Sequence, residues 1–284
     1  MRFDRLGSTL LSAALAAALA GNAQADSSQP VAAGEARVRL LASGTGNTNS
    51  APVFRGGIEV VLNPGWKTYW RYPGDAGIPP RFDWSGSENV AHVEVLYPAP
   101  KRITDGSGQT SIGYETRVTF PLRITAKDAA MPVTLRLKMD FATCEKLCIP
   151  AQAETALTFS SAATAEPSID EAEKRVPVRI GPKDASPPAA FEARVERGKS
   201  ADGSDRRIVI KTLTAAAGKF DLFAEGPDEE WTLSLPKLLE AKAGKAIFAI
   251  PLADSRFGKA DVPPKLRLTL IAGEQAFETE IPLD

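Results

Sequence analysis

The residues whose types and spacing indicate reactivity are two cysteines four positions apart, Cys144 and Cys148. The 284-residue chain contains no other cysteine. A pair this close can form a disulfide within a turn or one helical turn. It can also exchange disulfides with another protein, because one thiolate attacks and the second cysteine resolves the mixed disulfide. Two thiolates can instead bind a soft metal ion such as Cu(I). The spacing therefore leaves three alternatives: a structural disulfide, a redox couple or a copper site.

The size of the ring favours the redox couple without excluding the other two. Closing a ring of ~5 residues stabilises a fold by roughly 2 kcal/mol, against ~4.7 kcal/mol for a loop of 100 residues. The neighbours do not fix the thiol pKa, since Lys146 favours a thiolate and Glu145 opposes it. The sequence does not decide which cysteine attacks first, and we take Cys148 as the working assumption. The alternatives that remain are a non-catalytic adaptor with a structural disulfide and a Cu(I)-binding protein of copper tolerance.

The rest of the composition supports few other activities. His92 is the only histidine, so a Ser-His-Asp triad or a histidine-rich metal centre has little to draw on. The 34 basic and 35 acidic residues nearly cancel, which gives no attraction for nucleic acid. We expect no cofactor and no metal site.

The first residues predict export from the cytoplasm. Arg2 and Arg5 precede an apolar stretch over residues 6–20, and Ala23-Gln24-Ala25 is a small-x-small cleavage site. The stretch is shorter than the ~20 residues of a spanning helix. We expect a signal peptide over residues 1–25, cleaved near Ala25, and a periplasmic protein.

The elements that must position the cysteines are short β-strands separated by glycine and proline turns. The predicted fold class is all-β, with two immunoglobulin-like β-sandwich domains in series after the signal peptide. We place the first domain at residues 33–160 and the second at 189–284. Residues 161–188 are predicted to be a solvated linker, with a helical turn or two at Ser168–Arg175. A strand is expected at Trp231–Leu235.

Several stretches resemble the N-terminal periplasmic domain of the thiol:disulfide interchange protein DsbD, and more closely its copper-sensitivity suppressor branch, ScsB. In the first half they are Gly65–Gly74, Gly77–Pro80, Pro98–Arg102, Gly113-Tyr114, Val118–Leu122 and Cys144–Pro150. In the second half they are Phe223–Gly226, Trp231, Phe248–Leu252 and Leu268–Ile271. The resemblance covers nearly all of the chain after the signal peptide.

The resemblance implies a thiol:disulfide oxidoreductase with Cys144 and Cys148 at one end of an immunoglobulin-like sandwich. In the family this pair takes electrons from a membrane-embedded thiol reductase and passes them to periplasmic thioredoxin-like or isomerase proteins, some linked to copper tolerance. The membrane domain and the thioredoxin-like domain have no counterpart in this sequence, so we expect a separate protein to supply the electrons.

Family members also shield the pair with a short loop that carries an aromatic residue. The matching loop here, Asp105–Gly108, lacks one, so the resemblance suggests Tyr114 or Tyr69 as the shield. The aromatic cluster around Tyr69 and Trp70 is either sandwich core or a wall beside the cysteines. Because alternate residues of a strand face opposite sides, we expect at least one of these two side chains near the surface. Asp105, Tyr69, Trp70 and Tyr114 are the candidate shielding or partner-contact residues.

Overall fold

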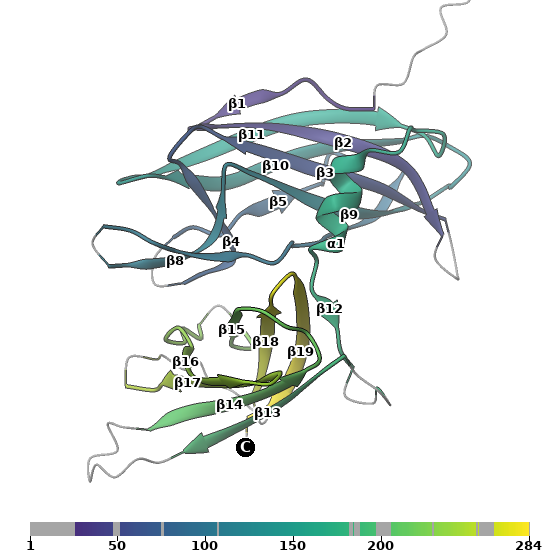
Figure 1. Ribbon diagram of the computed structural model, residues 1–284. Helices are drawn as coiled ribbons and strands as arrows, with labels where there is room; N and C mark the ends of the chain where they lie inside the picture. Colours follow the sequence, from purple (N-terminus) through teal and green to yellow (C-terminus); the bar gives the residue numbers. More distant parts are fainter. Residues whose placement is uncertain are drawn as a thin grey trace, which may run out of the picture.

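The computed structural model describes residues 26–47, 52–74, 77–106, 108–181, 184, 188–196, 206–228, 230–253, 255 and 264–283. Within these ranges the chain forms β-strands and one helix, arranged as two stacked sandwiches (Figure 1). The all-β fold class predicted from the sequence is confirmed. The predicted signal peptide lies outside the described residues. None of the described helical segments has the length and apolar character needed to cross a membrane.

The first sandwich packs a five-stranded sheet against a six-stranded sheet. The first sheet has the order β1-β2-β3-β9-β6, and the second has β11-β10-β4-β8-β7 with β5 paired to β10. The strands are β1 (Val31–Ala33), β2 (Ala36–Asn47), β3 (Pro52–Leu62), β4 (Lys67–Gly74), β5 (Arg81–Asp83), β6 (Val90–Val95), β7 (Lys101–Thr104), β8 (Thr110–Glu115), β9 (Arg117–Ala126), β10 (Val133–Cys144) and β11 (Cys148–Phe159). Phe54 and Phe120 from one sheet meet Trp70 and Phe141 from the other in a single core.

Strand β10 shows how the sequence sets the two faces of the six-stranded sheet. From Val133 to Met139 the apolar residues alternate with Thr, Arg and Lys, and the apolar ones are buried while the polar ones are not. This is the two-residue period of a strand with one face in the core. Ala142 and Cys144 continue the outward-facing series, yet both are buried. Something other than the core must therefore cover the outer face of the sheet at its cysteine end.

The second sandwich is smaller and is also made of two sheets, ordered β12-β19-β18-β15 and β13-β14-β17-β16. Its strands are β12 (Val178–Arg179), β13 (Ala189–Glu196), β14 (Arg207–Thr214), β15 (Phe220–Glu225), β16 (Lys237–Lys242), β17 (Lys245–Pro251), β18 (Lys265–Ala272) and β19 (Gln275–Pro282). Ile210 and Phe248 from one sheet meet Leu222, Leu268 and Phe277 from the other in a separate core.

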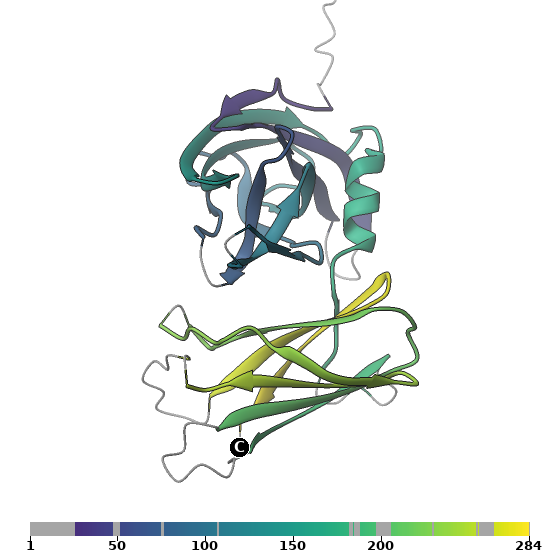
Figure 2. The ribbon, with the colours of Figure 1, turned by 60° about the vertical axis from the view of Figure 1, so that its left-hand side comes forward.

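The segment predicted as a solvated linker contains a helix that packs against the first sandwich, while most of its described residues are exposed. Helix α1 (Pro167–Lys174) begins with a proline in its first turn, and the N-cap residue Glu166 accepts a hydrogen bond from the Ser168 backbone. Ile169 is fully buried, and Arg55 forms ion pairs with Asp170 and Glu173 of the helix. Figure 2 shows α1 standing along the side of the first sandwich before the chain continues into β12. The helix is the one predicted near Ser168–Arg175.

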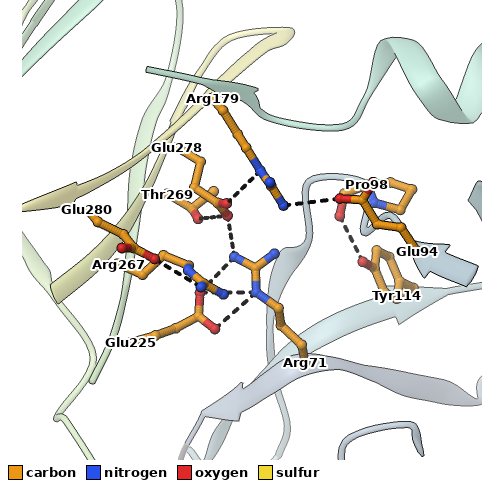
Figure 3. Close-up of polar contacts among 10 residues, drawn as sticks. All are labelled: Arg71, Glu94, Pro98, Tyr114, Arg179, Glu225, Arg267, Thr269, Glu278 and Glu280. Atoms are coloured by element: carbon orange, nitrogen blue, oxygen red, sulfur yellow. Dashed lines mark hydrogen bonds and ion pairs between the residues drawn. The ribbon is translucent and has the colours of Figure 1, made fainter. Parts of the chain in front are cut away.

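Ion pairs join the two sandwiches. Arg71 of β4 binds Glu225 of β15, with nitrogen–oxygen distances of 2.7 to 3.1 Å, and also pairs with Glu278 of β19 (Figure 3). Arg102 of β7 binds the Asp221 carboxylate at 2.8 and 2.9 Å. These residues are only partly exposed, so solvent screens their attraction less than it would at an open surface.

The strand expected at Trp231–Leu235 does not form, and the contact between sandwiches gives the reason. The Tyr72 hydroxyl of β4 donates to the Leu233 carbonyl at 2.8 Å and accepts from the Leu233 amide at 3.0 Å. A side chain of the first sandwich thus takes the backbone bonds that a neighbouring strand would otherwise supply. The edge strand forms just afterwards, as β16.

Candidate redox site

The two cysteines close the hairpin of β10 and β11. Cys144 ends β10, Cys148 begins β11, and the two residues face each other in the antiparallel register. A disulfide joins them, with their Cα atoms 4.1 Å apart. The turn between them is held by a hydrogen bond of 3.3 Å from the Glu145 amide to the Leu147 carbonyl. The pair therefore sits at the tip of a hairpin whose long ladder fixes both strand ends.

The two sulfur-bearing residues differ in access to solvent. Cys144 is 5% exposed, whereas Cys148 is exposed. A thiolate from another protein can approach Cys148, while Cys144 is covered. Attack on the exposed residue leaves the buried one as the second thiol, which is the arrangement required for exchange through a mixed disulfide.

Tyr69 is a side chain that covers Cys144. It lies on β4 and is 1% exposed, and its hydroxyl oxygen is 3.0 Å from the Cys148 sulfur. Its ring packs with Ala142 and Cys144 on the outer face of the six-stranded sheet. Gly77 lets the chain cross this ring, because a Cβ there would lie 2.4 Å from a ring carbon of Tyr69. A side chain at residue 77 would push the ring away from the sulfur.

The surroundings of Tyr69 keep its hydroxyl protonated. Burial raises the pKa of Tyr69, a hydrogen bond with the Ser111 side chain opposes the rise, and the Asp105 carboxylate adds to it. A protonated phenol can donate a hydrogen bond to sulfur, and donation to a thiolate is the stronger interaction. Tyr69 is thus arranged to favour a negative charge on Cys148.

Asp105 belongs to the loop between β7 and β8. Its backbone amide donates to the Gln109 carbonyl at 3.0 Å, and its carboxylate accepts from the Gln109 amide at 3.2 Å. These bonds close the loop and hold the carboxylate where it acts on the Tyr69 hydroxyl. The Asp105 carboxylate is thus the part of this loop that acts on Tyr69.

Residues 37–160 match the family model described as "Thiol:disulfide interchange protein DsbD, N-terminal". This segment is similar to the DsbD N-terminal domain. The match assigns the segment to thiol:disulfide exchange, and the described chain holds both cysteines in one disulfide at the site above. No curated protein matches the chain.

A solved structure extends the likeness beyond the DsbD N-terminal domain. The chain is similar to the crystal structure of the N-terminal periplasmic domain of ScsB from Proteus mirabilis, with 20% identity and a TM-score of 0.64. The alignment covers 88% of this chain and 93% of that one. At this identity the likeness concerns the fold, and it includes both sandwiches.

Two of the candidate residues lie elsewhere in the first sandwich. Tyr114 points into the core and donates its hydroxyl proton to the Pro98 carbonyl at 2.7 Å. Trp70 is fully buried, and its ring packs against Phe223 of the second sandwich at a centroid distance of 5.6 Å. The expectation that Tyr69 or Trp70 would lie near the surface is wrong. The two do face opposite sides of β4, but the disulfide hairpin and the chain at Gly77 cover Tyr69 as well.

The sequence interpretation missed the apolar rim around Cys148. Leu147 is 79% exposed and Ile149 is 39% exposed, on either side of this cysteine. Ile78, which follows the glycine packed on Tyr69, is 43% exposed. Leucine and isoleucine directly beside a cysteine in a turn are a signal that the sequence does contain. In the described part of the chain, no three His, Cys, Asp or Glu side chains gather as metal ligands would.

Proposed function

We propose that this chain is a periplasmic thiol:disulfide exchange protein that relays electrons through Cys144 and Cys148. The donor in this proposal is a membrane-embedded thiol reductase, and the acceptors are periplasmic thioredoxin-like or isomerase proteins. The observation that carries the proposal is the unequal exposure of two cysteines joined at a hairpin tip. The similar domain of ScsB is periplasmic, which supports the compartment.

In the proposed cycle the reduced protein attacks a partner's disulfide with the thiolate of Cys148. A bond forms between Cys148 and one partner sulfur, and the partner's other sulfur leaves with the electron pair and becomes a thiol. Cys144 then attacks the Cys148 sulfur, re-forms the internal disulfide and releases the partner's second thiol. Two electrons have passed to the partner. The donor's dithiol then reduces the internal disulfide by the same steps in reverse.

Tyr69 has two functions in this cycle. Its ring covers Cys144, which limits access of small oxidants and unrelated thiols to the buried sulfur. Its hydroxyl donates to the Cys148 sulfur and favours the thiolate that begins the exchange. The pair is therefore shielded on one side and reactive on the other.

The apolar rim supplies a contact surface for partners. Leu147, Ile149 and Ile78 would pack against apolar residues around the partner's own cysteines and hold the two sulfur centres together. Such a contact buries apolar surface and does not require a particular arrangement of charges on the partner. The same surface could therefore bind the donor and more than one acceptor.

Trapping the mixed disulfide tests the proposal. The Cys144→Ala variant keeps Cys148 but cannot resolve, so we expect a reductant-sensitive covalent adduct with a periplasmic thiol protein. The Cys148→Ala variant keeps only the covered thiol and serves as the matched control, with little or no adduct. No adduct from either variant, in cells with normal reductase capacity, would refute the relay. A reduction potential below about −300 mV would instead indicate a structural disulfide.

A further inference from the structure

Lys67 lies beside the buried cysteine. Its Cα is the direct partner of Cys144 in the pairing of β10 with β4. Residues directly opposite each other in an antiparallel pair share a face, with Cβ atoms roughly 4.5–5.5 Å apart. Lys67 is two residues from Tyr69, so both side chains leave β4 on the side that carries the disulfide. The side chain of Lys67 is therefore the nearest cationic one to Cys144 along β4.

The side chain of Lys67 is held against this face. Its exposed fraction is 6%, so most of its stem is covered. The ammonium nitrogen is not one of the fully buried atoms without a partner in the described chain, so it reaches water. The two other charged residues buried to this degree, Glu59 and Glu278, are both paired, with Arg39 at 2.6 Å and with Arg71 respectively. A thiolate on Cys144 would give the Lys67 ammonium a negative partner where solvent has limited access.

We propose that Lys67 stabilises the thiolate of Cys144 when the disulfide opens. This inference rests on the proposed function and assigns a residue to its second cysteine. An incoming thiolate attacks the sulfur of Cys148 and forms a bond with it. The bond between Cys148 and Cys144 breaks, and Cys144 leaves with the electron pair. The Lys67 ammonium then gains the negative partner that it lacks in the disulfide form.

Two residues of β4 therefore act on different sulfur atoms of the disulfide. Tyr69 acts on the exposed sulfur that is attacked, and Lys67 acts on the buried sulfur that leaves. A leaving thiol of lower pKa departs faster, so Lys67 accelerates opening of the disulfide. It also stabilises the reduced form over the disulfide, which makes the couple more oxidising.

The other charges near this face are better exposed to water. Glu115 of β8 is the register partner of Lys67 in the pairing of β4 with β8, and its side chain is exposed. Glu145 and Lys146 are exposed in the turn of the hairpin. Asp105 acts on Tyr69, on the Cys148 side of the pair. The side chain of Lys67 is largely covered while the side chains of Glu115, Glu145 and Lys146 are exposed, so water screens the Lys67 charge less strongly at Cys144.

The test replaces Lys67 in the full chain and uses Lys146 as the matched control. Lys67→Met removes the charge beside Cys144 and Lys67→Arg retains it, while Lys146→Met removes an exposed charge nearer in sequence. Lys67→Gln is a second neutral variant should the methionine fail to fold, and circular dichroism checks each protein. In a Cys148→Ala background, we expect Lys67→Met to raise the measured thiol pKa of Cys144, and Lys67→Arg to restore it.

Two further readouts use small thiols, so they remain valid even if no protein partner is found. With both cysteines present, Lys67→Met should slow opening of the disulfide by dithiothreitol severalfold. It should also shift the equilibrium with glutathione toward the disulfide by about tenfold, which is about 30 mV. Wild-type values for folded Lys67→Met or Lys67→Gln would overturn the proposal, as would an equal effect of Lys146→Met.

Discussion

The guanidinium of Arg71 binds both carboxylate oxygens of Glu225, so a residue two positions from Tyr69 is fixed to the second sandwich. The same guanidinium lies 4.2 Å above the ring of Trp70, which itself contacts Phe223. Strand β4 is therefore held by the second sandwich through the ion pairs of Arg71, the ring contact of Trp70 and the hydrogen bonds of Tyr72. The second sandwich thus supports the strand that carries Tyr69.

Arg71→Met should weaken this support. The substitution leaves Glu225 and Glu278 without their partner at a partly buried site, where breaking an ion pair costs about 3 kcal/mol. We expect the free energy of unfolding to fall by about that amount in urea melts. Arg136→Met is the control, because its ion pair with Glu88 is well exposed. Equal losses from the two variants would show that Arg71 is no more than a surface charge.

Tyr69→Phe should weaken the thiolate of Cys148. Loss of the hydroxyl removes a hydrogen bond to a charged group, which contributes about 1.5 kcal/mol, so the thiol pKa of Cys148 should rise by roughly one unit. The measurement is alkylation rate against pH in a Cys144→Ala background. Tyr114→Phe is the matched control, since it loses a buried hydrogen bond to Pro98 and should lower stability alone. An unchanged Cys148 profile in Tyr69→Phe would contradict the assignment.

Leu147→Ser should impair exchange with proteins more than exchange with small thiols. The leucine is 79% exposed, so its loss costs the isolated protein little, but it removes apolar contact area from a partner complex. We expect a several-fold lower rate with a periplasmic thiol protein and an unchanged rate with dithiothreitol. Leu213→Ser removes a leucine that is 48% exposed on the second sandwich and should alter neither rate.

Alkaline pH should destabilise the protein through Tyr97. Burial raises the pKa of Tyr97 to about 12, the Arg71 charge opposes this, and the Glu225 charge adds to it. The unfolded chain loses this proton near pH 10 while the folded protein keeps it, so stability is full below pH 10 and falls as pH approaches 12. Tyr97→Phe should remove about 1.4 kcal/mol of that fall, measured from denaturant melts at pH 8 and pH 11. The same slope in both proteins would contradict the assignment.

The sequence was sufficient for the strands with a clear two-residue period and for the cysteine pair. The alternation from Val133 to Met139 predicted β10, and short apolar strands at regular spacing predicted two sandwiches. The type and spacing of Cys144 and Cys148 identified the pair that the structure joins, and the family resemblance favoured the redox interpretation. These features depend on local pattern, which is visible in one sequence.

What the sequence did not reveal depends on contacts between distant segments. Tyr69 and Trp70 alternate as a strand requires, but nothing local shows that Gly77 and the hairpin tip cover the outer one. The backbone at Leu233 bonds to Tyr72 from the other sandwich, so its apolar alternation did not make a strand. Nothing in the sequence distinguishes Lys67 from a surface lysine, because its position beside Cys144 follows only from the pairing of β4 with β10.

The disulfide joins the last residue pair of the β10–β11 hairpin, and this placement affects whether the fold survives repeated opening of the disulfide. Pairing continues without a shift from Val133↔Phe159 to Thr143↔Ile149, so the ladder stays closed when the sulfur bond opens. The small ring also contributes little to the free energy of folding, roughly 2 kcal/mol. The reduced form should therefore keep the folded ladder, so that each turnover leaves the sandwich folded for the next.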